Sequence, residues 1–172
     1  MTATYRDATS ADAALLARIG TQTFVGTFGH LYRPADLAAF LAENHSEAAA
    51  AAVLVNPDYA TRFAHLGHEA AGYAMVAPAN LPHLDPATPT LELKRLYLMP
   101  GHFGLGLADA LMEWVYAVAT ERDARALALS VFSQNHRARR FYERHGFVSA
   151  GTYQFRVGTQ LDDEFVYVKP LA

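Results

Sequence analysis

The segment that most constrains the fold of this chain is residues 96–108, which read LYLMPGHFGLGLA. It predicts an apolar strand, a short turn and a glycine-rich entry into a helix. Glycines at such a junction let the backbone turn sharply and bring main-chain N–H groups against a ligand. The unsatisfied N–H groups and the positive dipole end of the helix then favour an anion. The segment therefore indicates a pyrophosphate site, although a Gly-x-Gly alone is more often an ordinary strand-to-helix turn.

Composition narrows the class of protein. The 172 residues are 52% hydrophobic and 18% charged, which predicts one globular domain spanning residues 1–172. A formal net charge of −3 gives no general electrostatic attraction to nucleic acid or to an anionic membrane, so neither is expected as a partner. The chain has no cysteine, which excludes disulfides, thiolate metal sites and a cysteine nucleophile.

Targeting and metal signals are also missing from the pattern of residues. No apolar run approaches the roughly 18 residues of a membrane span, and residues 1–7 lack the basic and apolar regions of a signal peptide. A cytoplasmic protein is therefore expected. The eight histidines are scattered, without an i,i+4 pair and a nearby third ligand, so no metal is expected.

Hydrophobic periodicity predicts a mixed order of elements. Helices are expected near residues 14–24, 34–41, 47–55, 106–119 and 135–145, and strands near 5–6, 59–66, 70–76, 91–99, 126–132, 147–157 and 164–169. Residues 67–69 read as a hairpin turn, and the four prolines within residues 77–90 predict a loop. Lys94 and Arg95 break the alternation of their strand, which suggests a bulge. This order predicts an α/β fold with a mixed, mainly antiparallel sheet.

A second motif, at residues 135–147, supports the interpretation of the glycine-rich segment as a ligand site. Residues 135–147 read NHRARRFYERHGF, and together with residues 103–108 they resemble the two signatures of the GNAT superfamily of acyl-CoA-dependent N-acetyltransferases. The second signature is complete, at Asn135, Ala138, Phe141, Tyr142, Gly146 and Phe147. The resemblance covers nearly the whole chain. It implies a central sheet of about six to seven strands, flanked by helices and splayed to admit acyl-CoA.

The resemblance implies acetyl-CoA as cosubstrate. Its pyrophosphate would bind the amides of about residues 104–109, called the glycine loop below. Its pantetheine arm would pair with the backbone of residues 96–98. The cofactor-binding residues expected on this basis are Leu96, Tyr97, Leu98, Phe103, Gly104, Leu105, Gly106, Leu107, Ala108, Asp109 and Asn135. Phe103 departs from the Gln or Arg that the family usually has there, so a side-chain contact to the cofactor is lost while the backbone N–H remains.

Tyr142 is the candidate general acid, because a phenol can give a proton or a hydrogen bond to the leaving thiolate. The alternative is a core role, since Tyr142 falls on an apolar helical stripe with Ala138 and Phe141.

Asn135 would contact the pantetheine or cap its helix, and both roles are compatible. The arginines of the same helix either form a solvated face or reach the 3′-phosphate of CoA; these are Arg137, Arg139, Arg140 and Arg144.

Glu92 is the candidate general base, because it is a carboxylate within an apolar strand and the acceptor ammonium must lose a proton before attack. It could instead bind a cationic substrate, or occupy a solvated edge of the sheet. Without a cysteine for an acyl-enzyme, direct attack of the amine in a ternary complex is favoured.

The acceptor is less constrained than the cofactor. Several short segments look like those of bacterial spermidine and polyamine acetyltransferases, among them Phe24 with Phe28, Glu92 with Arg95, and Asp162 with Asp163. A polyamine or other small cationic amine is thus the leading substrate, contacted by Phe24, Phe28 and Glu92. A protein N-terminus or lysine, an antibiotic amine, and a non-catalytic acetyl-CoA sensor are the alternatives, and the resemblance also allows a homodimer.

Overall fold

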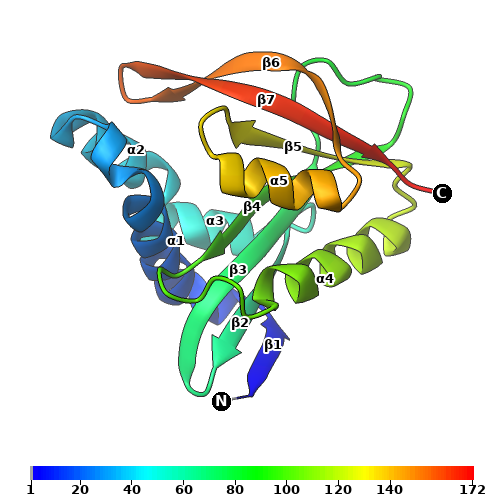
Figure 1. Ribbon diagram of the computed structural model, residues 1–172. Coiled ribbons are helices and arrows are strands. Elements are labelled where there is room, and N and C mark those ends of the chain that lie inside the picture. Colours follow the sequence, from blue (N-terminus) through cyan, green and yellow to red (C-terminus); the bar gives the residue numbers. More distant parts are fainter. Residues whose placement is uncertain (1) are drawn as a thin grey trace.

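The computed structural model describes residues 2–172 (Figure 1); Met1, with which the expected domain begins, lies outside the described residues. The strands are β1 Ala3–Asp7, β2 Ala60–Leu66, β3 Glu69–Pro78, β4 Thr90–Leu98, β5 Ala126–Phe132, β6 Val148–Val157 and β7 Gln160–Pro170. The helices are α1 Ala13–Phe28, α2 Pro34–Asn44, α3 Glu47–Val55, α4 Leu107–Glu121 and α5 His136–Arg144, with short 3-10 turns η1 Ser10–Asp12 and η2 Gly29–Leu31.

The strands form one seven-stranded sheet in the order β1-β2-β3-β4-β5-β7-β6. Every neighbouring pair is antiparallel except β4 and β5, which are parallel. Within the described residues, the pairing of β4 with β5 covers only Thr90–Glu92 on β4 and Ala126–Ala128 on β5. The two strands diverge beyond Glu92, as Figure 1 shows, so the expected mixed, mostly antiparallel and splayed sheet is confirmed.

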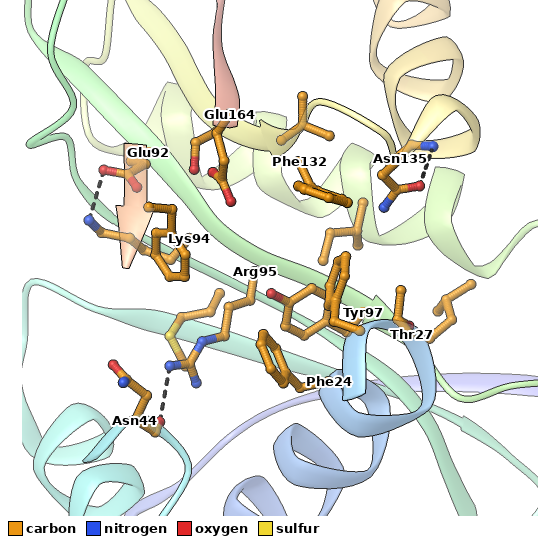
Figure 2. A pocket seen from close by; sticks show the side chains of 18 of the residues that line it. Phe24, Thr27, Asn44, Glu92, Lys94, Arg95, Tyr97, Phe132, Asn135 and Glu164 are labelled. Atoms are coloured by element: carbon orange, nitrogen blue, oxygen red, sulfur yellow. Dashed lines mark hydrogen bonds and ion pairs between the residues drawn. The ribbon is translucent and has the colours of Figure 1, made fainter. Parts of the chain in front are cut away.

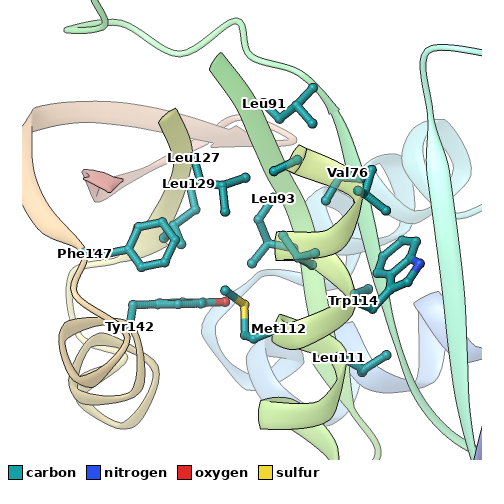
Figure 3. Packing of buried hydrophobic residues seen from close by; sticks show 14 of the residues in the cluster. Val76, Leu91, Leu93, Leu111, Met112, Trp114, Leu127, Leu129, Tyr142 and Phe147 are labelled. Atoms are coloured by element: carbon teal, nitrogen blue, oxygen red, sulfur yellow. The ribbon is translucent and has the colours of Figure 1, made fainter. Parts of the chain in front are cut away.

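Two layers of helices cover the sheet (Figure 1). Helices α1 and α3 pack on one face, where Leu16 and Ile19 meet Phe63 and Tyr73. Helix α4 lies on the other face, and its expected stripe is buried there; the stripe consists of Leu107, Leu111, Val115 and Val118. Burying a side chain of this size stabilises a fold by about 1.5–3 kcal/mol. Helix α5 adds Tyr142 to the same layer (Figure 3).

The bulge expected in β4 is present. Met75 of β3 pairs with Arg95, and the next residue, Val76, pairs with Leu93, which leaves Lys94 as the extra residue. An extra residue reverses the alternation of a strand. Leu91 and Leu93 therefore face α4 before the bulge, as do Leu96 and Leu98 after it. The bulge places Glu92 and Tyr97, five residues apart, on the opposite face.

Local sequence accounts for most element ends. Helix α3 begins after Ser46, whose hydroxyl accepts a hydrogen bond from Ala49 N, and α2 begins with Pro34 at its first turn. Helix α1 extends four residues beyond its expected end, because Phe24 and Phe28 pack into an aromatic cluster with Tyr32 and Phe40. Strand β7 starts four residues earlier than expected because β6 pairs with it from Gln160 onward.

Candidate active site

One cavity of about 950 Å³ joins the glycine loop to the gap between β4 and β5 and continues beneath α1 and α2. It draws its lining from all five long helices and from strands β3–β7. Since β4 and β5 separate after Glu92, the cavity connects the two faces of the sheet. A ligand held on the α4 side can therefore meet a second ligand that enters from the α1 side.

The glycine loop has an open backbone at the start of α4. Gly104 and Gly106 both have φ +76°, a left-handed conformation that disfavours residues with a Cβ. A Cβ at either position would meet no protein atom within 4 Å, so the space above the loop is open. Gly106 caps α4, whose first N–H groups are free to bind an anion. This cradle fits the pyrophosphate of acetyl-CoA.

Backbone groups along β4 fit the rest of that molecule. Residues 96–98 pair with β3 on one edge, while their other edge faces the gap. A peptide-like arm can add to such an edge through main-chain hydrogen bonds. The expected cofactor-binding residues all line the cavity except Leu105, whose side chain is 57% exposed and lies outside the lining. For Leu105, only a backbone contact with the cofactor remains a prediction.

Phe103, which stands where the resemblance leads us to expect Gln or Arg, stacks against a cationic side chain. The guanidinium carbon of Arg137 lies 3.6 Å from the centre of the Phe103 ring, a cation–π contact between α5 and the loop. Both residues line the cavity. Of the other arginines on α5, Arg144 also lines the cavity, whereas Arg139 donates to the Ser133 carbonyl and Arg140 is exposed.

Asn135 and Asp109 tie the ends of two helices to the site. The Oδ1 atom of Asn135 accepts a hydrogen bond from Ala138 N at 3.2 Å, so the capping role is confirmed. Asp109, in the first turn of α4, lies 3.0 Å from His145 Nε2 and 3.9 Å from Arg144. These contacts fix α5 against α4 and direct the Asp109 charge toward basic side chains.

Tyr142 is both a core residue and a cavity residue. Its side chain is 8% exposed and packs against Phe147, with ring centroids 5.9 Å apart (Figure 3). Its hydroxyl forms no hydrogen bond with any residue from 2 to 172. Burial raises the pKa of Tyr142, so the phenol keeps its proton at neutral pH. The cavity reaches this residue from the β4–β5 gap.

Glu92 lies on a central strand and is 6% exposed, so the solvated-edge alternative was wrong. Its Oε2 atom accepts a hydrogen bond from Lys94 Nζ at 2.7 Å (Figure 2). It also accepts one from Asn80 N at 3.2 Å. Lys94 also donates to Asn80 Oδ1 at 2.8 Å. Glu92 faces the cavity with its charge already compensated by a neighbouring cation.

Aromatic side chains surround the end of the cavity beneath α1 and α2 (Figure 2). Phe24 and Phe28, the residues expected to contact the substrate, lie there with ring centroids 5.3 Å apart. The other aromatic residues of this end are Tyr32, Phe40, Tyr97, Phe132, Tyr153 and Phe155. Rings of this kind bind apolar chains and, through their faces, cations.

Two charged residues of this end were not among the expected site residues, although Arg95 belongs to a segment noted in the sequence. Glu164 of β7 lines the cavity beside Tyr153, whose Oη lies 3.3 Å from Glu164 Oε2. Burial raises the pKa of Glu164 to about 7. Arg95 also lines the cavity, and its Nη2 donates to the Asn44 carbonyl at 3.1 Å. Unlike Glu92, which lies between two leucines, Glu164 directly follows two aspartates, so no signal in the sequence distinguished it.

The adjacent aspartates on β7 divide between the two faces of the strand. Asp162 is 6% exposed and accepts a hydrogen bond from the Tyr32 hydroxyl at 2.5 Å, whereas Asp163 is exposed. Neither lines the cavity.

Across residues 2–172, no group of three or more His, Asp or Glu side chains is arranged to hold a metal. Over the same residues, no helix combines the length and apolar character that crossing a membrane requires.

The sequence matches one family model and several known proteins. The family model described as "Acetyltransferase (GNAT) family" matches residues 20–147. An uncharacterized N-acetyltransferase of Mycobacterium tuberculosis is 35% identical over 160 residues, which cover 93% of this chain and 98% of that protein. One of Lactobacillus delbrueckii subsp. lactis is 29% identical over 155 residues, or 89% and 88% of the two chains.

A solved structure extends the comparison to the fold. The crystal structure of PaiA N-acetyltransferase from Thermoplasma acidophilum in complex with coenzyme A superposes with a TM-score of 0.78. The match covers 99% of this chain and 100% of that one, at 18% identity.

Proposed function

The chain belongs to the acetyltransferase (GNAT) family, and we propose that it acetylates the primary amine of a small cationic molecule, with a polyamine as the leading candidate. As a family member it is an acetyl-CoA-dependent N-acetyltransferase. The observation that carries the proposal is that one cavity joins the glycine loop to the aromatic end beneath α1 and α2. This end, hereafter the acceptor chamber, also contains Glu92 and Glu164.

Acetyl-CoA supplies an activated acetyl thioester when it is bound. The amides of the glycine loop and the start of α4 hold its pyrophosphate, and the free edge of residues 96–98 aligns the pantetheine. Tyr142 keeps its proton near the gap between β4 and β5 and donates a hydrogen bond to the departing sulfur. Tyr142 lines the cavity beside that gap, which supports a role for its hydroxyl in the reaction.

The chamber recognises the acceptor by charge and by apolar contact. The Glu164 carboxylate favours an ammonium more than Glu92 does, because Glu92 is already paired with Lys94. The rings of Phe24 and Phe28 pack along a hydrocarbon chain. Asp162 lies behind the Tyr32 hydroxyl and adds negative potential without touching the acceptor. A polyamine combines cationic groups with methylene segments, which matches both features.

Arg95 favours a second candidate. Its guanidinium lines the chamber and has no carboxylate within 4.0 Å among residues 2–172. A cation in that position suits an amine that also carries an anionic group, such as an amino acid or a peptide terminus.

An amine panel tests these proposals together. Release of CoA thiol would be measured with acetyl-CoA and a matched set of diamines, polyamines, amino acids, a peptide and an aminoglycoside, and the products identified by mass spectrometry. The leading candidate requires spermidine or spermine to have the highest kcat/KM. A preference for amino acids or peptides would select the second candidate, and acetyl-CoA binding without turnover of any amine would indicate a sensor.

A further inference from the structure

We propose that Glu164, rather than Glu92, accepts the proton that the acceptor ammonium must lose before it attacks the thioester. The inference rests on the proposed amine acetylation and assigns the base within it. Glu164 lies on β7, 72 positions after Glu92 in the chain, and no motif of the sequence points to it.

The faces of the strands bring Glu164 to the acceptor chamber. Phe165 and Tyr167 pack with the α4 layer, so Glu164 projects to the opposite face of β7. Glu164 pairs with Phe132 of β5 on one side and with Tyr153 of β6 on the other. Directly opposed residues of antiparallel strands share a face, and all three line the cavity. Figure 2 shows the Glu164 carboxylate directed into the chamber.

The two carboxylates of the chamber differ in their partners. Glu92 is 2.7 Å from the Lys94 ammonium and also accepts from Asn80 N. Glu164 has no Lys, Arg or His nitrogen within 4.0 Å anywhere in residues 2–172, and its polar neighbours are hydroxyl groups, with Tyr153 Oη at 3.3 Å. An incoming ammonium therefore finds uncompensated negative charge at Glu164 but not at Glu92.

The surroundings also suit Glu164 to proton exchange near neutral pH. Burial raises its pKa to about 7, and hydrogen bonds from Ser130 and Tyr153 oppose that rise. A base whose pKa lies near the working pH is the most effective. The titratable and charged groups that face this region are Tyr153 of β6, Glu92, Lys94, Arg95 and Tyr97 of β4, Asp162 of β7, and Tyr32.

The proton transfer balances as follows. An N–H bond of the ammonium breaks, its electron pair stays on nitrogen, and a Glu164 oxygen gains the proton directly or through one water. That electron pair forms the N–C bond to the acetyl carbon as the C–S bond breaks. Of the two protons left on nitrogen, one stays in the amide and the other goes, by way of the Tyr142 hydroxyl or water, to the sulfur. The Glu164 proton returns to solvent.

The test compares Glu164→Gln, Glu92→Gln and a matched control, Asp163→Asn, which removes a neighbouring charge from the exposed face of β7. The pH dependence of kcat and kcat/KM would be measured for each with the best amine, together with the thermal shift caused by acetyl-CoA as a check on folding. In Glu164→Gln, kcat should fall by roughly 10²-fold or more and the acidic limb near pH 7 should disappear. An amine whose own pKa lies well below the assay pH should restore most of the rate, because it arrives without the extra proton. Asp163→Asn should keep the wild-type profile.

Three results would overturn the assignment. If Glu164→Gln raises KM with kcat and the acidic limb intact, Glu164 only binds the ammonium. If Glu92→Gln alone removes the limb, Glu92 is the base. If the weakly basic amine gives no rescue although Glu164→Gln still binds acetyl-CoA, the lost function is not proton removal. A wild-type protein that acetylates no amine would instead refute the proposed function, and the assignment with it.

Discussion

Lys94 Nζ lies 2.7 Å from Glu92 Oε2, and both side chains are largely buried, at 19% and 7% exposure. The two residues are two positions apart on β4, and alternate residues of a strand share a face. It compensates the one carboxylate that the sequence singled out as a base, and Asn80 bonds to both partners.

Removing one partner of this pair should destabilise the protein. In Glu92→Gln the Lys94 ammonium keeps only neutral amide oxygens as acceptors, so the free energy of unfolding should fall by about 1–3 kcal/mol, less than for a fully enclosed pair. The double variant Glu92→Gln/Lys94→Met should recover most of that loss. Urea denaturation measures both, with the exposed Glu121→Gln as a control expected to change stability by less than about 0.5 kcal/mol. Equal stability of wild type and Glu92→Gln would mean that the pair contributes nothing.

The Tyr142 hydroxyl should matter for turnover and not for folding. Tyr142→Phe keeps the ring packed against Phe147 and should lower kcat by roughly 10²-fold. Since the hydroxyl has no hydrogen-bond partner within residues 2–172, the melting temperature should stay the same or rise slightly. Steady-state kinetics and thermal denaturation test this, with Tyr5→Phe on the edge strand β1 as a control. A kcat within about threefold of wild type would leave Tyr142 with a packing role only.

The glycine loop should respond to substitution according to whether a residue lines the cavity. Gly101 and Gly106 both have a left-handed backbone and open space around a Cβ, but only Gly106 lines the cavity. At a hundredfold excess over Kd, acetyl-CoA should stabilise wild type by about 2.7 kcal/mol. Gly106→Ala should lose most of this stabilisation and Gly101→Ala should retain it, although both lose stability from backbone strain. Equal ligand shifts in the two variants would place the pyrophosphate elsewhere.

Arg137 should contribute to cofactor affinity through charge. Stacking on Phe103 holds its guanidinium at the cavity rim, where CoA phosphates are expected. Arg137→Ala should raise the Kd for acetyl-CoA about fivefold to thirtyfold at low salt, with the difference shrinking as salt screens the contact. Isothermal titration at two ionic strengths measures this against Arg140→Ala, whose side chain is exposed outside the cavity. A salt-independent loss would point to packing with Phe103 in place of a phosphate contact.

Glu164 should make stability depend on pH. Its folded-state pKa, raised to about 7, exceeds the unfolded value, so the folded state favours the protonated carboxyl. The contribution is fully present below about pH 4.5 and is lost as pH rises through 7, with an upper limit of about 3 kcal/mol that cavity water reduces. Relative to wild type, Glu164→Gln should therefore gain stability between pH 5 and pH 8 in parallel denaturant titrations, about 1–2 kcal/mol in total. A constant difference across that range would contradict the raised pKa.

Much of the architecture follows from local sequence. The strand, glycine loop and helix at residues 96–108, the cap at Asn135 and the bulge at Lys94 depend on residues close together in the chain. Such features follow from backbone preferences and short-range hydrogen bonds. With the order of the elements they predicted a mixed, mainly antiparallel sheet and the loop that fits a pyrophosphate, whereas the splayed arrangement of the sheet was expected from the family resemblance.

The charges of the acceptor chamber depend on which strands become neighbours. Glu92 was expected to be the base, and nothing local indicated that Glu164, which lies 72 positions later, would enter the same chamber. Only the sheet order β4-β5-β7-β6 and the separation of β4 from β5 bring the two together. The same long-range pairing turns Asp162 inward against Tyr32 and Asp163 outward. The sequence by itself determined where backbone groups could hold an anion, whereas the tertiary structure decided which carboxylates share the chamber, because strand pairing and side-chain facing depend on contacts far apart in the chain.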